Sequence, residues 1–212
     1  MYWKIYSHIE SEVYSLSYSI SLDEVHKNVY SPQIAELQLR VYTLLESLVK
    51  RKYLECGGKD KKIKYDDKKC VSLISKTDNY KNKIVITDWY DYKFDKKIFK
   101  PFEKNEERVK KENFTNVGKA GNANYAWNNA YQSLRHNLEE ALPHYGTLYY
   151  LFEGLSALRL LLSPPYAYGR EIFSVVELRE DGKTVTSYSS GQIGILQGAG
   201  YIVSSIPEGW QE

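Results

Sequence analysis

The residues with the clearest potential for chemistry lie between positions 125 and 137, where the chain reads YAWNNAYQSLRHN. On a helix of about 100° per residue, this spacing places four polar side chains in a strip beside a stripe of large apolar ones. The polar strip is Asn128, Gln132, Arg135 and His136, and the apolar stripe is Trp127, Tyr131, Leu134 and Leu138. Polar groups beside a buried seam need partners, and histidine exchanges a proton near neutral pH. The strip is therefore the first candidate for a functional site that transfers protons.

The same spacing also permits a purely structural role. Gln132 lies four residues before His136, and Tyr131 lies four residues before Arg135, so each pair can meet on one face of a helix. In this interpretation His136 forms a hydrogen bond inside a helical bundle, and Arg135 pairs with Glu139. For His144, which follows Pro143 in an expected loop, a solvated surface position is favoured. Both interpretations of the strip stay open at this point.

Two helices are predicted in the N-terminal part of the chain. Ser31 can cap a helix that has Pro32 in its first position and apolar residues at helical spacing up to Leu48. The Gly57-Gly58 pair predicts its end after Glu55. A shorter amphipathic stretch, residues 3–20, precedes it and is also expected to be helical.

A second pair of helices is predicted between residues 122 and 163. The first contains the polar strip and is expected to end at Pro143, which lacks a backbone donor. The next begins after a Thr147 cap, reads LYYLFEGLSALRLLL, and is expected to end at Ser163-Pro164-Pro165. Its apolar residues cover most of its circumference, so it is predicted to be the central helix of the bundle.

The segment from Lys59 to Lys111 differs from its surroundings because charged residues are dense in it. Two β-branched patches, 71–74 and 84–87, flank the turn-like pair Asp78-Asn79, which predicts a short hairpin in a mobile insertion. Its many lysines could contact nucleic acid. Aspartates interleave with them at Asp60, Asp66 and Asp67, however, so a solvated loop is favoured.

Near the C-terminus the pattern changes to period two. Residues 175–180 and 183–186 alternate on either side of Asp181-Gly182, which is a strong hairpin signal. The sequence thus predicts a single domain over 1–212, with a helical core at about 1–57 and 112–168, an insertion at about 58–111 and a β-rich tail at about 169–212. The expected fold class is mainly α: a helical bundle with a small β insertion and a C-terminal β-hairpin.

Composition excludes several classes of protein. A formal net charge of +2 does not by itself imply a polyanionic partner, and the N-terminus lacks the pattern of a secretory signal. The most apolar segment, 148–162, is too short to cross a bilayer and carries charge. Cys56 and Cys70 have neither metal-ligand nor disulfide spacing. We therefore expect a cytoplasmic protein with no membrane association, no metal and no cofactor.

The helices together resemble a known family. The early helix SPQIAELQLRVYTLLESLVKRKY, the later WNNAYQSLRHN and the apolar LYYLFEGLSALRLLL resemble the HEPN-like helical domains of prokaryotic toxin and phage-defence systems. The shared pattern is a tryptophan, then Ala-Tyr followed by Asn or Gln, two further residues, and a basic residue directly before a histidine. The resemblance covers about residues 30–57 and 122–163.

The resemblance implies a helical bundle that forms a homodimer across a shared cleft and acts as a metal-independent ribonuclease on RNA; an antitoxin or partner protein is a further candidate partner. Metal-free RNA cleavage requires a base, a cation for the phosphorane oxygens and an acid. His136 would serve as base or acid and Arg135 as phosphate clamp. A second acid would be His144 or the His136 of a second copy. The substrate-binding groups would be Tyr131, Gln132, Asn128 and His144.

This chain departs from the family's usual signature, in which a histidine follows the arginine by five to seven positions on one helix. Here His136 follows Arg135 directly, and the next histidine, His144, is nine positions on. The departure motivates two alternatives to a ribonuclease. One is a non-catalytic module that binds RNA, a nucleotide or a protein, and the other is a structural assembly component.

Overall fold

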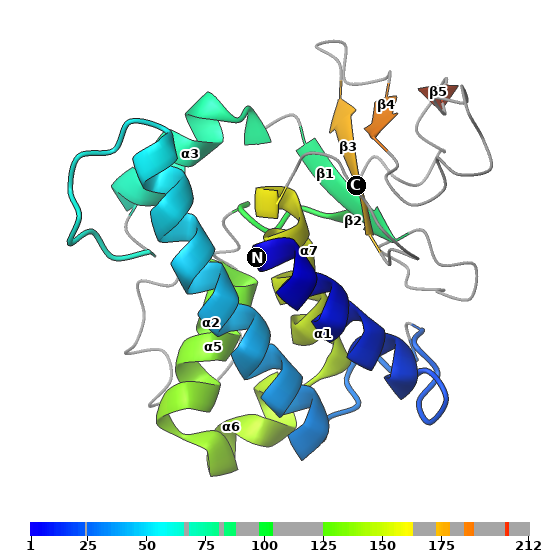
Figure 1. Ribbon diagram of the computed structural model, residues 1–212. Helices are drawn as coiled ribbons and strands as arrows, with labels where there is room; N and C mark the ends of the chain where they lie inside the picture. Colours follow the sequence, from blue (N-terminus) through cyan, green and yellow to red (C-terminus); the bar gives the residue numbers. More distant parts are fainter. Residues whose placement is uncertain are drawn as a thin grey trace.

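The computed structural model describes residues 1–23, 25–65, 68–80, 83–87, 98–103, 125–162, 173–178, 185–188 and 202–203. Its fold is mainly helical, with a small sheet beside the helices (Figure 1). The helices are α1 (Tyr2–Leu16), α2 (Pro32–Glu55), α3 (Lys68–Thr77), α5 (Ala126–His136), α6 (Leu138–Tyr145) and α7 (Leu148–Leu162). The strands are β1 (Lys83–Thr87), β2 (Ile98–Phe99), β3 (Phe173–Leu178), β4 (Val185–Tyr188) and β5 (Ile202–Val203). None of the helices in these ranges is long and apolar enough to span a membrane.

The two central helices are α2 and α7, which pack directly against each other. Nearly all of α7 is buried, as its continuous apolar surface predicts. The close approach depends on Gly154, where an added Cβ would lie 2.4 Å from the ring of Tyr42. The Tyr42 hydroxyl donates to the carbonyl oxygen of Tyr150 at 2.7 Å. The prediction that the 148–162 helix lies at the centre of the bundle is confirmed.

Both ends of α2 are set by local sequence. The Ser31 Oγ accepts a hydrogen bond from the Ile34 amide at 3.1 Å, and Pro32 occupies the first helical position. At the other end Gly57 adopts a positive φ of 89°, and the amides of Gly57 and Gly58 donate to the carbonyls of Leu54 and Tyr53. This pair of bonds is a Schellman motif, which requires a residue that tolerates the left-handed region. The predicted start and end of this helix are both confirmed.

The helix that carries the polar strip ends earlier than predicted. It stops at His136, because Asn137 has a non-helical backbone (φ −151°, ψ 71°), and Pro143 lies inside the following helix α6. The expectation that Pro143 ends a helix is therefore wrong. The carbonyl that proline leaves without a donor belongs to Glu139, which is exposed, so water can satisfy it.

The start of α7 was predicted correctly, but its cap was not. Thr147 is buried, and its side-chain oxygen has no hydrogen-bond partner among the described residues. Its backbone instead forms an isolated antiparallel bridge with Tyr30. The residues expected to end this helix, 163–165, lie outside the described part of the chain.

The hairpin predicted within the insertion is wrong in its first half. Residues 71–74 belong to α3, where Cys70, Val71 and Ile74 are buried and Ser72 is exposed, which is helical spacing. The second patch, 84–87, does lie in a strand, β1. Short β-branched runs fit both a strand and one face of a helix, and the packing of α3 on α2 selects the helix here.

The sheet joins two regions that were predicted as separate, the insertion and the C-terminal tail. Its strand order is β2-β1-β3-β4-β5 with antiparallel pairing throughout, so strands of the insertion lie beside strands of the tail. Leu178 pairs with Val185 in the antiparallel β3–β4 register, and Asp181-Gly182, the predicted turn of this hairpin, lies outside the described residues. Phe99 and Phe173 contact Phe152 of α7 and hold the sheet against the helices.

Candidate functional site

The predicted polar strip of α5 is divided into a buried half and an exposed half. Asn128 is fully buried, Gln132 is half-buried, and Arg135 and His136 are exposed. Tyr131, which belongs to the apolar stripe, is buried with a 5% exposed fraction. The two halves therefore have different roles available to them.

The buried half is organised by Tyr65, a residue outside the predicted site. Its hydroxyl donates to Asn128 Oδ1 at 2.6 Å and accepts from Gln132 Nε2 at 2.5 Å. Residues 128 and 132 are four apart, so one phenol can reach both amides on the same helix face. The predicted contact between Gln132 and His136 is replaced by this network. Only the helical spacing of the amides signalled a shared partner, and nothing in the sequence pointed to position 65.

An aromatic cluster holds this part of α5 in place. Trp127 is fully buried, its ring lies against those of Tyr42 and Tyr65, and its Nε1 donates to the carbonyl of Pro101 at 2.9 Å. Tyr125 stacks on Trp127 with nearly parallel rings, and burial raises the pKa of Tyr125 to about 12, so its phenol stays neutral. This rigid aromatic cluster fixes the position and direction of the C-terminal end of α5.

The exposed half begins with Arg135, whose guanidinium lies 5.8 Å from the centre of the Tyr131 ring. A cation at this distance from an aromatic face is attracted to it. The Tyr131 hydroxyl lies 3.5 Å from Glu46 Oε2, a long and weak hydrogen bond. The alternative pairing of Arg135 with Glu139 does not form, because α5 ends at His136 and Glu139 belongs to α6. The predicted meeting of Tyr131 and Arg135 is confirmed.

His136 is exposed and makes no hydrogen bond or ion pair within the part of the chain that the structure describes. The interpretation that it bonds inside the bundle is therefore wrong. Other histidines of the chain behave differently: His8 Nε2 lies 3.0 Å from Glu12, and His26 Nδ1 lies 2.7 Å from Asp23. His136 thus presents its imidazole to solvent beside Arg135.

The last turn of α5 offers a structural reason for two basic residues as well. Cations near the C-terminus of a helix interact favourably with its dipole, typically by about 0.3–1 kcal/mol. His144 occupies the corresponding place in the last turn of α6 and is exposed. The expectation that His144 lies in a loop is wrong, whereas its expected surface position is confirmed.

No group of three or more histidine, cysteine or carboxylate side chains is placed to hold a metal ion within the described ranges. Cys70 is buried, and burial raises the pKa of the Cys56 thiol, which disfavours the reactive thiolate form. An open groove of about 520 Å³ lies between α1 and α2, lined mainly by apolar side chains such as Ile5 and Leu39. It contains none of the predicted site residues.

Comparison of the chain with protein-family models, with curated proteins and with solved structures gives no match. The assignment of the candidate site therefore depends on the geometry of its residues alone. The described residues offer one exposed arginine–histidine pair, held at the end of a helix whose buried half is fixed by aromatic packing and a phenol–amide network.

Proposed function

We propose that the protein is a HEPN-like, metal-independent endoribonuclease that acts as a toxin or anti-phage effector, with Arg135 and His136 at its active site. The observation that carries the proposal is the exposure of both side chains at the end of α5, with no intramolecular partner for the imidazole among the described residues. A histidine with no such partner, adjacent to an arginine, supplies two of the three groups that metal-free phosphodiester cleavage needs, a base and a cation.

In the proposed reaction the ribose 2′-oxygen attacks the adjacent phosphorus, and its proton passes to His136. Arg135 stabilises the negative charge that develops on the phosphorane oxygens. The 5′-oxygen then leaves with a proton from an acid, which produces a 2′,3′-cyclic phosphate and a 5′-hydroxyl. Tyr131 acts on Arg135 as a positioning residue, because its ring lies beneath the guanidinium.

The acid in this reaction comes from a second copy of the chain in a homodimer, which contributes its own His136, or from His144. A single α5 carries one histidine, since the helix ends at His136 and His144 belongs to α6. Sedimentation equilibrium measures whether the chain is a dimer. Mixing wild type with an excess of His136→Ala chains distinguishes the two acids: activity per wild-type chain falls if the acid comes from the second copy.

The test is incubation of the full chain with single-stranded RNA in the presence of EDTA. Wild type is expected to produce fragments with cyclic phosphate ends, and His136→Ala and Arg135→Ala are expected to lower the rate by about 100-fold or more. His8→Ala and Arg51→Ala are matched controls: His8 is an exposed histidine of α1, and Arg51 also lies over a tyrosine ring, that of Tyr2. Growth arrest on expression, relieved by His136→Ala, is the corresponding result in cells. The proposal fails if no RNA is cleaved, or if His136→Ala cleaves as fast as wild type.

A second candidate is a module of the same fold that binds RNA, a nucleotide or a protein without cleaving RNA. It is favoured by the position of the α5 end, because no histidine follows Arg135 by five to seven residues on that helix. This candidate predicts RNA binding that is steeply salt-dependent, weakened by Arg135→Ala and unaccompanied by any cleavage.

A further inference from the structure

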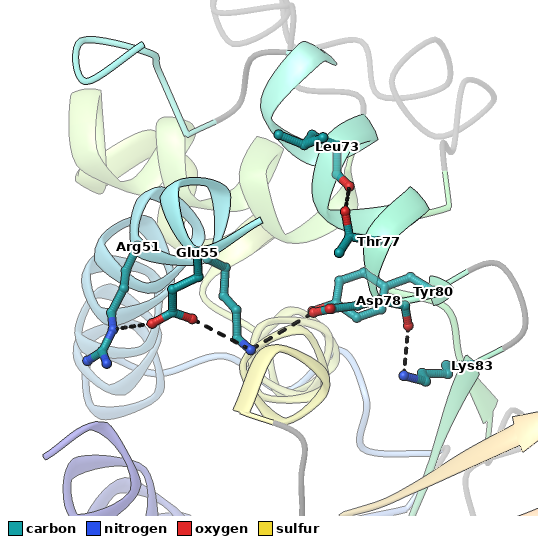
Figure 2. Close-up of polar contacts among 8 residues, drawn as sticks. Arg51, Glu55, Leu73, Thr77, Asp78, Tyr80 and Lys83 are labelled. Atoms are coloured by element: carbon teal, nitrogen blue, oxygen red, sulfur yellow. Dashed lines mark hydrogen bonds and ion pairs between the residues drawn. The ribbon is translucent and has the colours of Figure 1, made fainter. Parts of the chain in front are cut away.

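Four lysines in the loop that follows α2, at positions 59, 61, 62 and 64, are exposed. Their ammonium groups make no ion pair or hydrogen bond within the described part of the chain. By contrast, Arg51 Nε binds Glu55 at 2.7 Å, and Lys83 Nζ donates to the Asp78 carbonyl at 2.7 Å (Figure 2). Intramolecular charge pairing therefore does not account for the loop lysines.

The loop that carries these lysines has a defined backbone. It begins at the Schellman motif of Gly57 and Gly58, and Asp60 then forms a turn in which its carboxylate accepts the Lys62 amide at 2.8 Å. Ile63 and Tyr65 are buried on either side of the exposed Lys64. Because the apolar residues anchor the loop, ordering it on a ligand costs little conformational entropy.

Tyr65 connects this loop to α5. Its hydroxyl is hydrogen-bonded to Asn128 and Gln132, and Gln132 lies one helical turn, about 6 Å of rise, before His136. The loop and α5 lie on the same side of α2 (Figure 1). Hydrogen bonds between residues more than sixty positions apart in the sequence thus connect the lysine loop to the helix that ends in the Arg135–His136 pair.

We propose that the loop 59–64 and the exposed end of α5 form one continuous RNA-binding surface, on which the lysines hold the phosphate backbone of the strand whose scissile bond lies at His136. This inference rests on the proposed function and extends it to the substrate path. Within residues 59–64 four lysines stand against one aspartate, Asp60, and Asp66 and Asp67 follow in the sequence, so the lysine segment itself carries the net positive charge that a polyanion requires.

The surface can be tested in a His136→Ala background, where the RNA stays intact. Fluorescence anisotropy with a labelled single-stranded RNA is measured at several salt concentrations for Lys61→Gln/Lys64→Gln. Each lost phosphate contact lowers the slope of log K against log salt by about 0.7, so two contacts lower it by about 1.4. The corresponding loss of affinity near physiological salt is about tenfold.

The matched control is Lys4→Gln/Arg51→Gln, which removes the same charge from α1 and the end of α2. It is expected to change the affinity by less than about twofold, because nonspecific long-range attraction is screened at physiological salt. Equal losses of RNA affinity in the two double variants would contradict the proposed RNA-binding surface. Equal competition by polyglutamate and by unlabelled RNA of the same charge would also overturn RNA as its occupant.

The experiment separates this inference from the proposed function. If wild type cleaves RNA and the loop variant binds and cleaves RNA like the control, the proposed RNA-binding surface is wrong but the proposed ribonuclease activity is supported. If wild type cleaves nothing but the loop variant loses affinity and slope, the surface stands and the ribonuclease fails. In an active enzyme the loop variant is expected to raise KM about tenfold and leave kcat unchanged, as for a residue that binds substrate and transition state equally.

Discussion

The cations on α2 and those on the loop 59–64 differ in what surrounds them. Arg40 forms two hydrogen bonds with Glu12, at 2.6 and 2.7 Å, and thereby joins α2 to α1, while Lys50 pairs with Glu46 one turn away. The loop lysines have no such partners among the described residues, although the loop itself is anchored by Tyr65. Charges of the first kind serve the fold, and charges of the second kind are available to a ligand.

Paired and unpaired cations are expected to affect different properties, stability and ligand binding, which a count of charges does not distinguish. Substitution of a paired cation is expected to change stability, and substitution of a loop lysine is expected to change binding with little effect on stability. The net charge of +2 conceals the difference, because it averages both regions. The following variants test this difference, beginning with Trp127 of the aromatic cluster, which packs against Tyr65.

Trp127→Ala is expected to destabilise the protein by about 3–5 kcal/mol, because it removes a fully buried ring and the hydrogen bond to Pro101. The Tyr65 ring packs against Trp127, so RNA affinity is also expected to fall at temperatures where the variant is still folded. Urea unfolding and anisotropy measure the two effects. Trp3→Ala on α1 is the control, with a smaller loss of stability and unchanged affinity. An unchanged affinity in folded Trp127→Ala would show that the aromatic cluster does not hold the loop.

Tyr65→Phe is expected to cost about 1–3 kcal/mol, because Asn128 and Gln132 lose a buried hydrogen-bond partner while the aromatic packing stays. Tyr2→Phe removes a phenol that bonds to Ser47 at an exposed position and is expected to cost almost nothing. Thermal unfolding compares the two. If both substitutions cost the same, Tyr65 does not anchor the loop to α5.

Arg40→Gln is expected to cost up to about 1 kcal/mol near neutral pH, a small value because both partners are about one-third exposed. The hydrogen bond from Arg40 holds the pKa of Glu12 below its usual value of 4.5, and His8 contributes in the same direction. A carboxylate whose pKa is lowered by folding stabilises the folded state above its unfolded pKa and loses this contribution as the pH falls. The difference between wild type and Arg40→Gln in urea is therefore expected to shrink below pH 4.5. A difference that grows on acidification would contradict this assignment.

Lys61→Gln/Lys64→Gln is expected to change the free energy of unfolding by less than about 0.5 kcal/mol, since neither ammonium group has a partner to lose among the described residues. Lys50→Gln breaks the exposed ion pair with Glu46, one helical turn away, and is expected to lower the free energy of unfolding by about 0.3–0.5 kcal/mol. Denaturant titrations of both variants provide the comparison. A loop variant that is clearly less stable than Lys50→Gln would mean that these lysines support the fold.

Local signals in the sequence predicted α2 from beginning to end, because its serine cap, first-turn proline and terminal glycines act within a few residues. They failed for residues 71–74, where a short β-branched run fits two structures, and for Pro143, where solvent satisfies the carbonyl that proline frees. The joining of β1 to β3 was also missed, because a period-two pattern specifies a strand but not its neighbour.

For the candidate site, helical periodicity identified the polar strip of α5 but could not predict which of its residues are buried and which are exposed. Whether Asn128 or His136 is buried depends on which side of the helix receives Trp127 and its aromatic neighbours, and on where the helix stops. The role of Tyr65 was not predictable, because its partners are more than sixty residues away and no local pattern connects them. The lysines were visible in the sequence, but their separation from intramolecular partners was not.

The sequence by itself determined where most helices lie, which residues form the core of α7, and that an arginine and a histidine are adjacent on one helix. These properties follow from caps, turns and periodicity, which act over the length of a few residues. Only the tertiary structure decided that His136 faces solvent, that Tyr65 joins the lysine loop to α5, and that insertion and tail share one sheet. Such contacts join residues distant in the chain, and their formation depends on how the whole core packs rather than on any single segment.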